Sequence, residues 1–199
     1  MKKKGIIAAA FLSFTMAFSV SAQTTFGLKL SGNLTNVSLT SKDESNGKFH
    51  PGVSFGGFVK TEIGRGFSVQ PELSLKYTEA KLRTSYEKTK YKYAAVEIPV
   101  YVQKEFRAGT GKILIGAGPH IGYGLSADIR TEKLPEGSPF ENVIELDHWY
   151  AGGGISTGYE FKNKISVNGG YQLSYDFSSR KKTSRIRTQT ISLGIGYRF

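Results

Sequence analysis

Residues 188–199, at the end of the sequence, read T-Q-T-I-S-L-G-I-G-Y-R-F and alternate between large apolar and small or polar side chains. Successive side chains of a β-strand point to opposite faces of its sheet, so this alternation predicts a strand with one apolar and one polar face. The apolar positions are Ile191, Leu193, Ile195, Tyr197 and Phe199. Such a strand belongs in a sheet that separates an apolar environment from a polar one.

The same two-residue period recurs in seven further segments. Each is long enough to cross a hydrocarbon core of about 30 Å as a tilted strand, which takes roughly 9 to 11 residues. Short connections alternate with long ones between the segments, a pattern typical of outer-membrane barrels, in which the short turns face the periplasm. The eight predicted strands cover residues 25–39, 52–63, 67–78, 93–106, 113–127, 148–161, 165–177 and 188–199.

The period alone does not say which face of the barrel is inside. A soluble eight-stranded ligand-binding barrel shows the same alternation with its apolar face inward. The interior of eight strands is only wide enough to be filled by side chains, so the Gly-, Ser- and Thr-rich row fits there and the Phe, Tyr, Leu and Ile row would overfill it. We therefore predict an all-β fold, an eight-stranded antiparallel up-and-down transmembrane β-barrel. A soluble exported ligand-binding barrel is the alternative.

The first 22 residues have the composition of a cleaved export signal. Three lysines at positions 2–4 precede an apolar stretch at 5–20, and Val20-Ser21-Ala22 is a small-residue cleavage site. The apolar stretch is shorter than most membrane-spanning helices and contains three hydroxyl residues. We expect a signal peptide at 1–22 and a barrel domain at 23–199 that is exported to the outer membrane.

Composition limits the classes of partner. The chain contains no cysteine, which excludes both disulfides and a lipid-anchored cysteine after the signal peptide, and its formal net charge is +11 at pH 7. A basic excess favours nucleic acid, an anionic membrane surface or acidic ligands. Because an exported chain does not meet nucleic acid, we expect the membrane surface or acidic ligands instead.

Three prolines, Pro71, Pro99 and Pro119, lie inside predicted strands, where each removes a ladder hydrogen bond. We expect a bulge or a water-bonded carbonyl at each. The stretches around them are V-Q-P-E-L at 69–73, V-E-I-P-V at 96–100 and G-A-G-P-H-I-G at 116–122. These motifs resemble those of the porin-like outer-membrane β-barrel family of Gram-negative bacteria, of the eight-stranded OmpA/OmpX kind. The resemblance covers the mature chain and departs from the family at Tyr101-Val102-Gln103, where a more apolar run is expected.

This resemblance implies a location and a fold but no catalytic residue. The final strand is similar to the C-terminal strand of bacterial outer-membrane barrels, which the insertion machinery recognises, so Tyr197 and Phe199 are the expected insertion signal. The expected partners are the barrel-insertion machinery and outer-membrane lipid, including lipopolysaccharide. We expect a monomer, no cofactor and no nucleic-acid partner.

The polar row carries charged residues that would face the lumen. Charges inside a narrow barrel are costly unless they are paired or hydrated, so one interpretation is an ion-paired network that fills the lumen. The alternative is a small-solute pore with a narrow polar lumen. The residues on this row are Lys29, Lys60, Glu62, Glu72, Lys76, Glu97, Glu105, Glu160, Asp176 and Arg198.

Two of the predicted long loops, 79–92 and 178–187, are strongly basic. Such clusters favour anionic partners, although a merely solvated loop tip has the same composition. We predict a structural or surface-interaction role in which these loops meet lipopolysaccharide phosphates or, as a second possibility, acidic glycans. The basic residues are Lys81, Arg83, Lys88, Lys90, Lys92, Arg180, Lys181, Lys182, Arg185 and Arg187.

Catalysis and metal binding find little support in the sequence. The three histidines, His50, His120 and His148, are scattered, and no spacing singles out a serine nucleophile beside one of them. The glycine-rich stretches lack the spacing of a phosphate-binding loop. We therefore expect no enzyme activity, no catalytic residue and no metal site.

Overall fold

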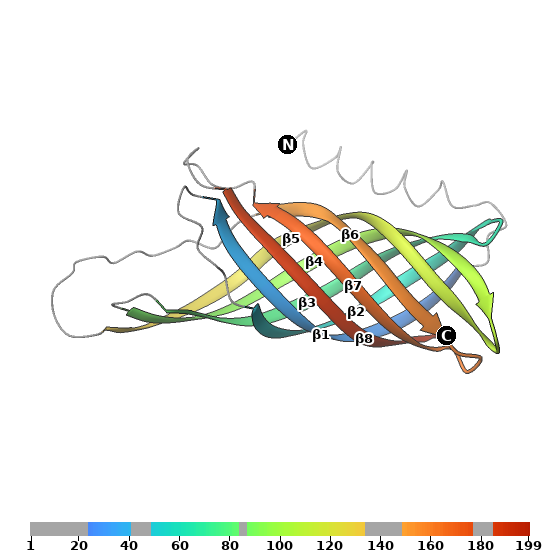
Figure 1. Ribbon diagram of the computed structural model, residues 1–199, viewed down its shortest axis with the longest axis horizontal. Helices are drawn as coiled ribbons and strands as arrows, with labels where there is room; N and C mark the ends of the chain where they lie inside the picture. Colours follow the sequence, from blue (N-terminus) through green and yellow to red (C-terminus); the bar gives the residue numbers. More distant parts are fainter. Residues whose placement is uncertain (1–23, 41–48, 84–86, 134–148, 177–184) are drawn as a thin grey trace, which may run out of the picture.

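The computed structural model describes residues 24–40, 49–83, 87–133, 149–176 and 185–199. Eight antiparallel strands form a closed barrel in which each strand pairs with the next and the last pairs with the first (Figure 1). The predicted fold class is confirmed. The strands are β1 (Thr24–Thr40), β2 (Phe49–Gly64), β3 (Phe67–Arg83), β4 (Glu87–Ala108), β5 (Gly111–Lys133), β6 (Trp149–Glu160), β7 (Ile165–Asp176) and β8 (Arg185–Arg198).

The two faces of the sheet are opposite in chemistry. Large apolar side chains point outward and are exposed, as at Leu193, where 67% of the residue is accessible. The buried side chains are mostly polar, and Glu97 is only 2% accessible. A soluble barrel would bury the apolar row, so this arrangement rules out the soluble ligand-binding alternative. Within the described ranges, no helix is long and apolar enough to cross a membrane.

Three strands extend beyond their neighbours at the long-loop end. Pairing continues to Arg83 and Lys88 between β3 and β4, and to Glu87 and Lys133 between β4 and β5 (Figure 1). The predicted loop at 79–92 is therefore wrong, because most of it forms a hairpin. Lys and Arg alternate there with Ala80, Leu82, Thr89 and Tyr91, a period of two that is compatible with two paired β-strands.

The prolines interrupt the ladder without bulges. The register is the same on both sides of Pro71 and Pro99, and ladder pairs are missing beside them between β3 and β4 and between β4 and β5. Proline lacks an N–H, so it loses pairing with the neighbour on one side while the other side continues. The register shifts lie elsewhere, between Ala94 and Ala95 and between Glu62 and Gly64, so the prolines carry no bulge. The water-bonded carbonyl, which was the other possibility at each proline, stays a prediction.

Two adjacent glycines on β6 provide a test of the packing. A Cβ at Gly152 would overlap the carbonyl oxygen of Leu173, whereas the nearest atom to a Cβ at Gly153 is 3.8 Å away. We expect Gly152→Ala to lower the free energy of unfolding by about 1–3 kcal/mol, as overpacking does. Gly153→Ala is the matched control and should change it by less than about 1 kcal/mol. Urea titration in lipid vesicles measures both, and equal effects would contradict the packing described.

Candidate functional site: the polar lumen

The lumen contains acidic and basic side chains that pair mostly between strands that are not neighbours. The Nζ of Lys29 on β1 lies 3.2 Å from a carboxylate oxygen of Glu72 on β3. Arg198 on β8 contacts Glu160 on β6 at 2.7 Å. These pairs cross the interior and link walls of the barrel that share no backbone hydrogen bonds. Ion pairs in the interior therefore connect strands that the backbone hydrogen bonds do not connect.

Glu97 on β4 is the most deeply buried charge, and three donors surround its carboxylate. Lys76 Nζ lies 3.1 Å away, Gln172 Nε2 donates at 2.7 Å, and the Tyr150 hydroxyl donates at 3.2 Å. The amide of Gln172 also donates to the Tyr101 hydroxyl at 3.3 Å. Burial of a carboxylate is costly unless its oxygens are hydrogen-bonded, and here the three donors come from three different strands, β3, β6 and β7.

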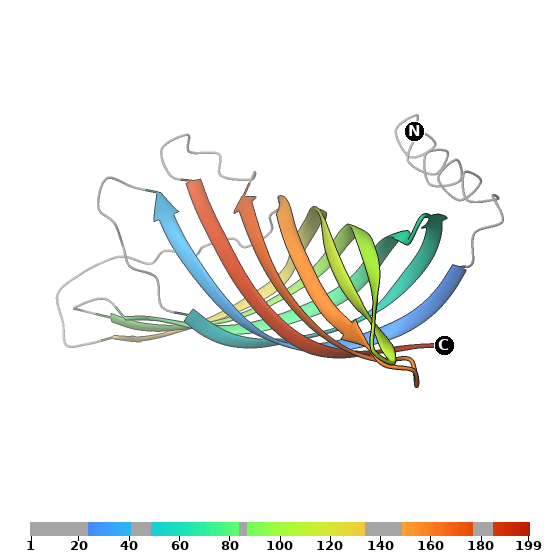
Figure 2. The same cartoon turned by 45° about the vertical axis from the view of Figure 1, so that its right-hand side comes forward.

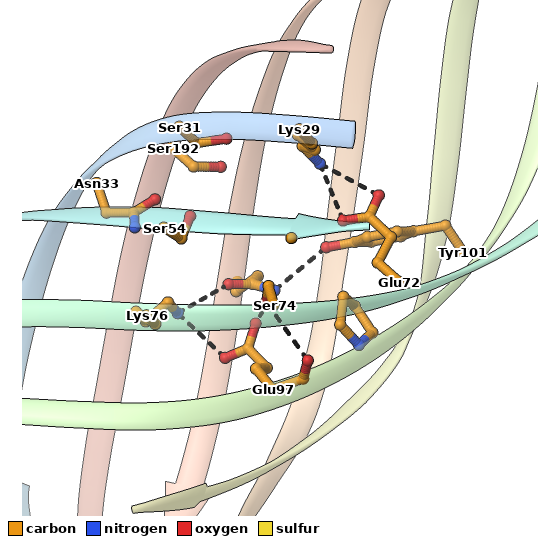
Figure 3. A pocket seen from close by; sticks show the side chains of 13 residues that line it. Lys29, Ser31, Asn33, Ser54, Glu72, Ser74, Lys76, Glu97, Tyr101 and Ser192 are labelled. Atoms are coloured by element: carbon orange, nitrogen blue, oxygen red, sulfur yellow. Dashed lines mark hydrogen bonds and ion pairs between the residues drawn. The ribbon is translucent and has the colours of Figure 1, made fainter. Parts of the chain in front are cut away.

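A second cluster lies deeper in the lumen, toward the short turns. Gln70 Nε2 donates to Glu72 at 2.8 Å, and both carboxylate oxygens of Glu72 accept from Lys29 (Figure 3). Lys29 lines a cavity of about 40 Å³ on one side and a cavity of about 20 Å³ on the other. The Lys29–Glu72–Gln70 cluster therefore lies between two cavities that each hold at most a few water molecules.

The third cluster is at the short-turn end. Glu105 forms an ion pair with Lys60 at 2.6 Å and accepts a hydrogen bond from Lys112 at 2.9 Å. Glu160 accepts two bonds from the Arg198 guanidinium, at 3.1 Å from Nε and 2.7 Å from Nη2. The bidentate geometry fixes both side chains, since two parallel bonds leave little freedom to rotate.

Not every residue of the predicted network takes part. Eight of the predicted residues form the ion pairs above: Lys29, Lys60, Glu72, Lys76, Glu97, Glu105, Glu160 and Arg198. Glu62 lies at the end of β2 and is exposed to solvent. Asp176 ends β7, in register with Tyr150, and its side chain lies outside the described part of the chain.

Sequence reasoning missed Lys112, Tyr101 and Gln172 as members of the network. Tyr101 and Gln103 are buried while Val102 between them is exposed, so their departure from a more apolar run follows from their inward position. The period of two already placed Tyr101 on the same face as Glu97. Lys112 was predicted to lie in a turn. Its pairing in register with Arg107 shows instead that it is the second residue of β5.

One serine and one histidine meet in the lumen. His120 Nε2 lies 2.8 Å from Ser174 Oγ, and both side chains are buried. The other ring nitrogen, Nδ1, has no hydrogen-bond partner, so the acid that would orient a catalytic histidine is missing from this pair. His50 is buried on β2, and His148 lies outside the described residues. Among the described residues, no group of three His, Asp or Glu side chains is placed to hold a metal ion.

The basic residues predicted in loops fall into three places. Lys81 and Arg83 end β3 and Lys88, Lys90 and Lys92 begin β4, whereas Arg185 and Arg187 begin β8. Arg180, Lys181 and Lys182 lie outside the described residues. At the other end of β8, Tyr197 and Phe199 are exposed on the outward face with their rings in edge contact at 5.3 Å. Their role as an insertion signal stays a prediction.

The apolar outer surface and the ion-paired interior together define a membrane-spanning β-barrel. The family model of the outer membrane protein beta-barrel domain matches residues 6–199, and the chain belongs to this family. The protein is therefore an outer-membrane protein, and the family resemblance predicted from the sequence is confirmed.

Solved structures similar to this chain are outer-membrane barrels. Neisserial surface protein A (NspA) has a TM-score of 0.50 and 13% identity, covering 87% of this chain and 97% of that chain. Ail, the attachment invasion locus protein of Yersinia pestis, has a TM-score of 0.48 and 13% identity, covering 88% of this chain and 98% of that chain. At such identity the likeness concerns the fold alone. No curated protein sequence matches the chain.

The buried pair of Lys76 and Glu97 can be tested by removing one charge. We expect Glu97→Gln to lower the free energy of unfolding by about 3 kcal/mol, because Lys76 is left buried without an acid. The second substitution Lys76→Met should restore more than half of the loss. Urea titration in lipid vesicles, with heat-modifiable gel mobility to report folding, measures both.

The control removes a charge from the pair that is more exposed. Lys112 is 38% accessible, and Glu105 keeps Lys60 when Lys112 is replaced. Lys112→Gln should therefore change the free energy of unfolding by less than about 1 kcal/mol. Equal losses for Glu97→Gln and Lys112→Gln would contradict the assignment of Glu97 as the central buried charge.

Proposed function

We propose that the protein is a non-conducting outer-membrane barrel whose sheet extension at the long-loop end binds phosphate groups of lipopolysaccharide in the outer leaflet. The observation that carries this proposal is the register of β3, β4 and β5 beyond the barrel. Lys81 pairs with Lys90, and Lys90 pairs with Arg130, so three basic residues occupy one row across three strands.

An anion bound at this basic row would reduce the repulsion between its like charges. Directly opposed residues of antiparallel strands share a face, and like charges in such pairs destabilise the sheet. The neighbouring rows each add two basic residues and one acidic one, or the reverse. The row toward the tip is Arg83, Lys88 and Glu132, and the row toward the barrel is Glu79, Lys92 and Asp128. Six basic positions against three acidic ones leave a net positive surface that bound phosphate would neutralise.

The position of this surface relative to the apolar band favours lipid over glycan as its ligand. Position 81 follows Leu75 and Tyr77 at the strand period of two, and both of these residues are exposed on the outward apolar face. Tyr123 and Trp149 pair across β5 and β6 with their rings 4.9 Å apart, an aromatic contact of the kind that marks a membrane interface. The basic row therefore lies just beyond the apolar band, where lipid phosphates lie. An acidic glycan of another cell is the second candidate for the same chemistry.

The interior supports a packed barrel more than a pore. Two cavities lined by described lumen residues have volumes of about 40 and 20 Å³, and Lys29 lines both. Cavities of this size hold at most a few water molecules, which supports a packed lumen over the continuous water path that a hydrated ion needs. We propose no catalytic role for His120 and Ser174.

Replacing the central row tests the outer surface. We expect the triple variant Lys81→Gln, Lys90→Gln and Arg130→Gln to bind lipopolysaccharide about tenfold more weakly in vesicles and with a flatter salt dependence, because charge attraction is lost. The matched control is Arg180→Gln, Lys181→Gln and Lys182→Gln, which removes the same charge from the segment of the sequence between β7 and β8. An unchanged affinity in the first variant would overturn the proposal, and an equal loss in both variants would move the contact to a diffuse basic surface.

Single-channel recording separates the packed barrel from the pore. The refolded protein should show no stepwise conductance in planar bilayers. A variant with Lys29→Ser and Glu72→Ser, which removes the pair between the two cavities, should show small steps and serves as the positive control for the assay. Steady conductance of the unmodified protein would favour the small-solute pore.

A further inference from the structure

The three short turns lie at the same end of the barrel (Figure 2), and each is hydrogen-bonded to a strand outside its own hairpin. The turn between β2 and β3 is bonded to β4, through the amide of Glu105 and the carbonyl of Gly66 at 2.8 Å. The turn between β4 and β5 accepts a bond at Ala108 from the Tyr159 hydroxyl of β6 at 2.9 Å. The turn between β6 and β7 is bonded to β8, through Lys164 and Arg198 at 3.1 Å. Each of these turns is therefore hydrogen-bonded to the strand that follows its own hairpin.

The short-turn end carries basic residues that have no acidic partner among the described residues. We define the basic rim as Arg65, Lys104, Arg107, Lys162 and Lys164. Among the described residues, none of the five forms an ion pair, while the acidic Glu105 and Glu160 nearby are already paired inside the lumen. Glu62 is the one exposed acidic side chain of this end in the described part of the chain. The rim therefore has a net positive charge that the protein itself does not neutralise.

Two residues of the basic rim adopt a backbone conformation that L-residues rarely adopt. Arg65 has φ of 55° and Lys164 has φ of 65°, both in the left-handed region. Glycine or asparagine occupies such turn positions without comparable strain. A charged residue at a strained position, twice and at the same end of the barrel, indicates that the charge has a use there.

Four of the five cations of the rim lie at the border of the apolar band. Arg107 follows Phe106, Lys162 follows Phe161, and Lys164 precedes Ile165; these three apolar neighbours are all exposed on the outer surface. Lys104 pairs in register with Phe67, and its Nζ lies over the Phe67 ring at 4.1 Å from the centroid while it donates to the Arg65 carbonyl. One residue beyond an apolar band is the depth at which the phosphates of a phospholipid leaflet lie.

We propose that the basic rim binds the phosphate groups of anionic phospholipids, such as phosphatidylglycerol, in the leaflet at the short-turn end. In barrels of this class that leaflet faces the periplasm. The position of the cations at the edge of the apolar band favours lipid over the carboxylates of peptidoglycan, which lie farther from the membrane. The inference does not depend on lipopolysaccharide binding at the opposite end.

A position-specific probe tests the basic rim. The chain has no cysteine, so Thr110→Cys, in the exposed turn between β4 and β5, provides a single thiol for a fluorophore. The labelled protein is refolded in phosphatidylcholine vesicles that contain a small fraction of lipid with a nitroxide headgroup label. We expect quenching by labelled phosphatidylglycerol to exceed quenching by labelled phosphatidylcholine by at least about threefold at low salt, and this preference to vanish at high salt.

Two variants and two soluble competitors test whether the lipid preference comes from the basic rim. Arg107→Gln, Lys162→Gln and Lys164→Asn together should abolish the preference, whereas Arg180→Gln, Lys181→Gln and Lys182→Gln, between β7 and β8 in the sequence, should leave it unchanged. Heat-modifiable mobility shows that both variants fold. Equal quenching by the two lipids, or a preference that survives in the rim variant, would overturn the proposal. Loss of the preference in inorganic phosphate but not in chloride of equal ionic strength would assign the rim to free phosphate instead. A fluorescence response to soluble peptidoglycan fragments without a lipid preference would overturn it in favour of the cell wall.

Discussion

The pairing of β1 with β8 is the constraint on which the rest of the structure depends. Lipid offers no hydrogen bonds, so a sheet in the membrane must close on itself, and here the ladder from Gly27–Arg198 to Thr40–Arg185 provides the closure. Closure at eight strands gives an interior that side chains fill. That interior excludes the large apolar row and forces it outward, which explains why a chain with negative mean hydropathy forms a membrane protein.

Closure also determines how the charges are arranged. Inside a narrow barrel an inward-pointing side chain can reach beyond the adjacent strand, so Lys29 contacts Glu72 and Arg198 contacts Glu160 across an intervening strand, while Lys76 pairs with Glu97 on the adjacent strand. These pairs stabilise the barrel against collapse or shear of its walls and at the same time fill the path that an ion would need. Among the described residues, the basic rim at the short-turn end holds cations without an ion pair. Pairing inside the barrel and exposed charge at its ends are the basis of the proposals for a packed lumen and for two basic surfaces.

The period of two in the sequence was enough to predict the number of strands, the two faces and the residues of the polar row. It did not predict which charges pair, because that depends on the stagger of strands around the barrel, which no local pattern records. It also missed the hairpin at 79–92, because a segment rich in Lys and Arg resembles a solvated loop. Only the backbone pairing distinguishes a hairpin from a loop there. Tyr101 shows the opposite case: its inward position was already present in the alternation with Glu97, although its hydrogen bond with Gln172 was not.

The inverted placement of the two faces is the central claim, and accessibility along β8 tests it most directly. Because the chain lacks cysteine, a spin label can be attached at each position from Ile191 to Ile195 in turn, in vesicles, and its exposure to oxygen and to a water-soluble relaxation agent measured. The structure predicts an oscillation with a period of two, in which oxygen accessibility is high at Ile191, Leu193 and Ile195 and low at Ser192 and Gly194. An oscillation of the opposite phase, or equal accessibility along the strand, would contradict the account.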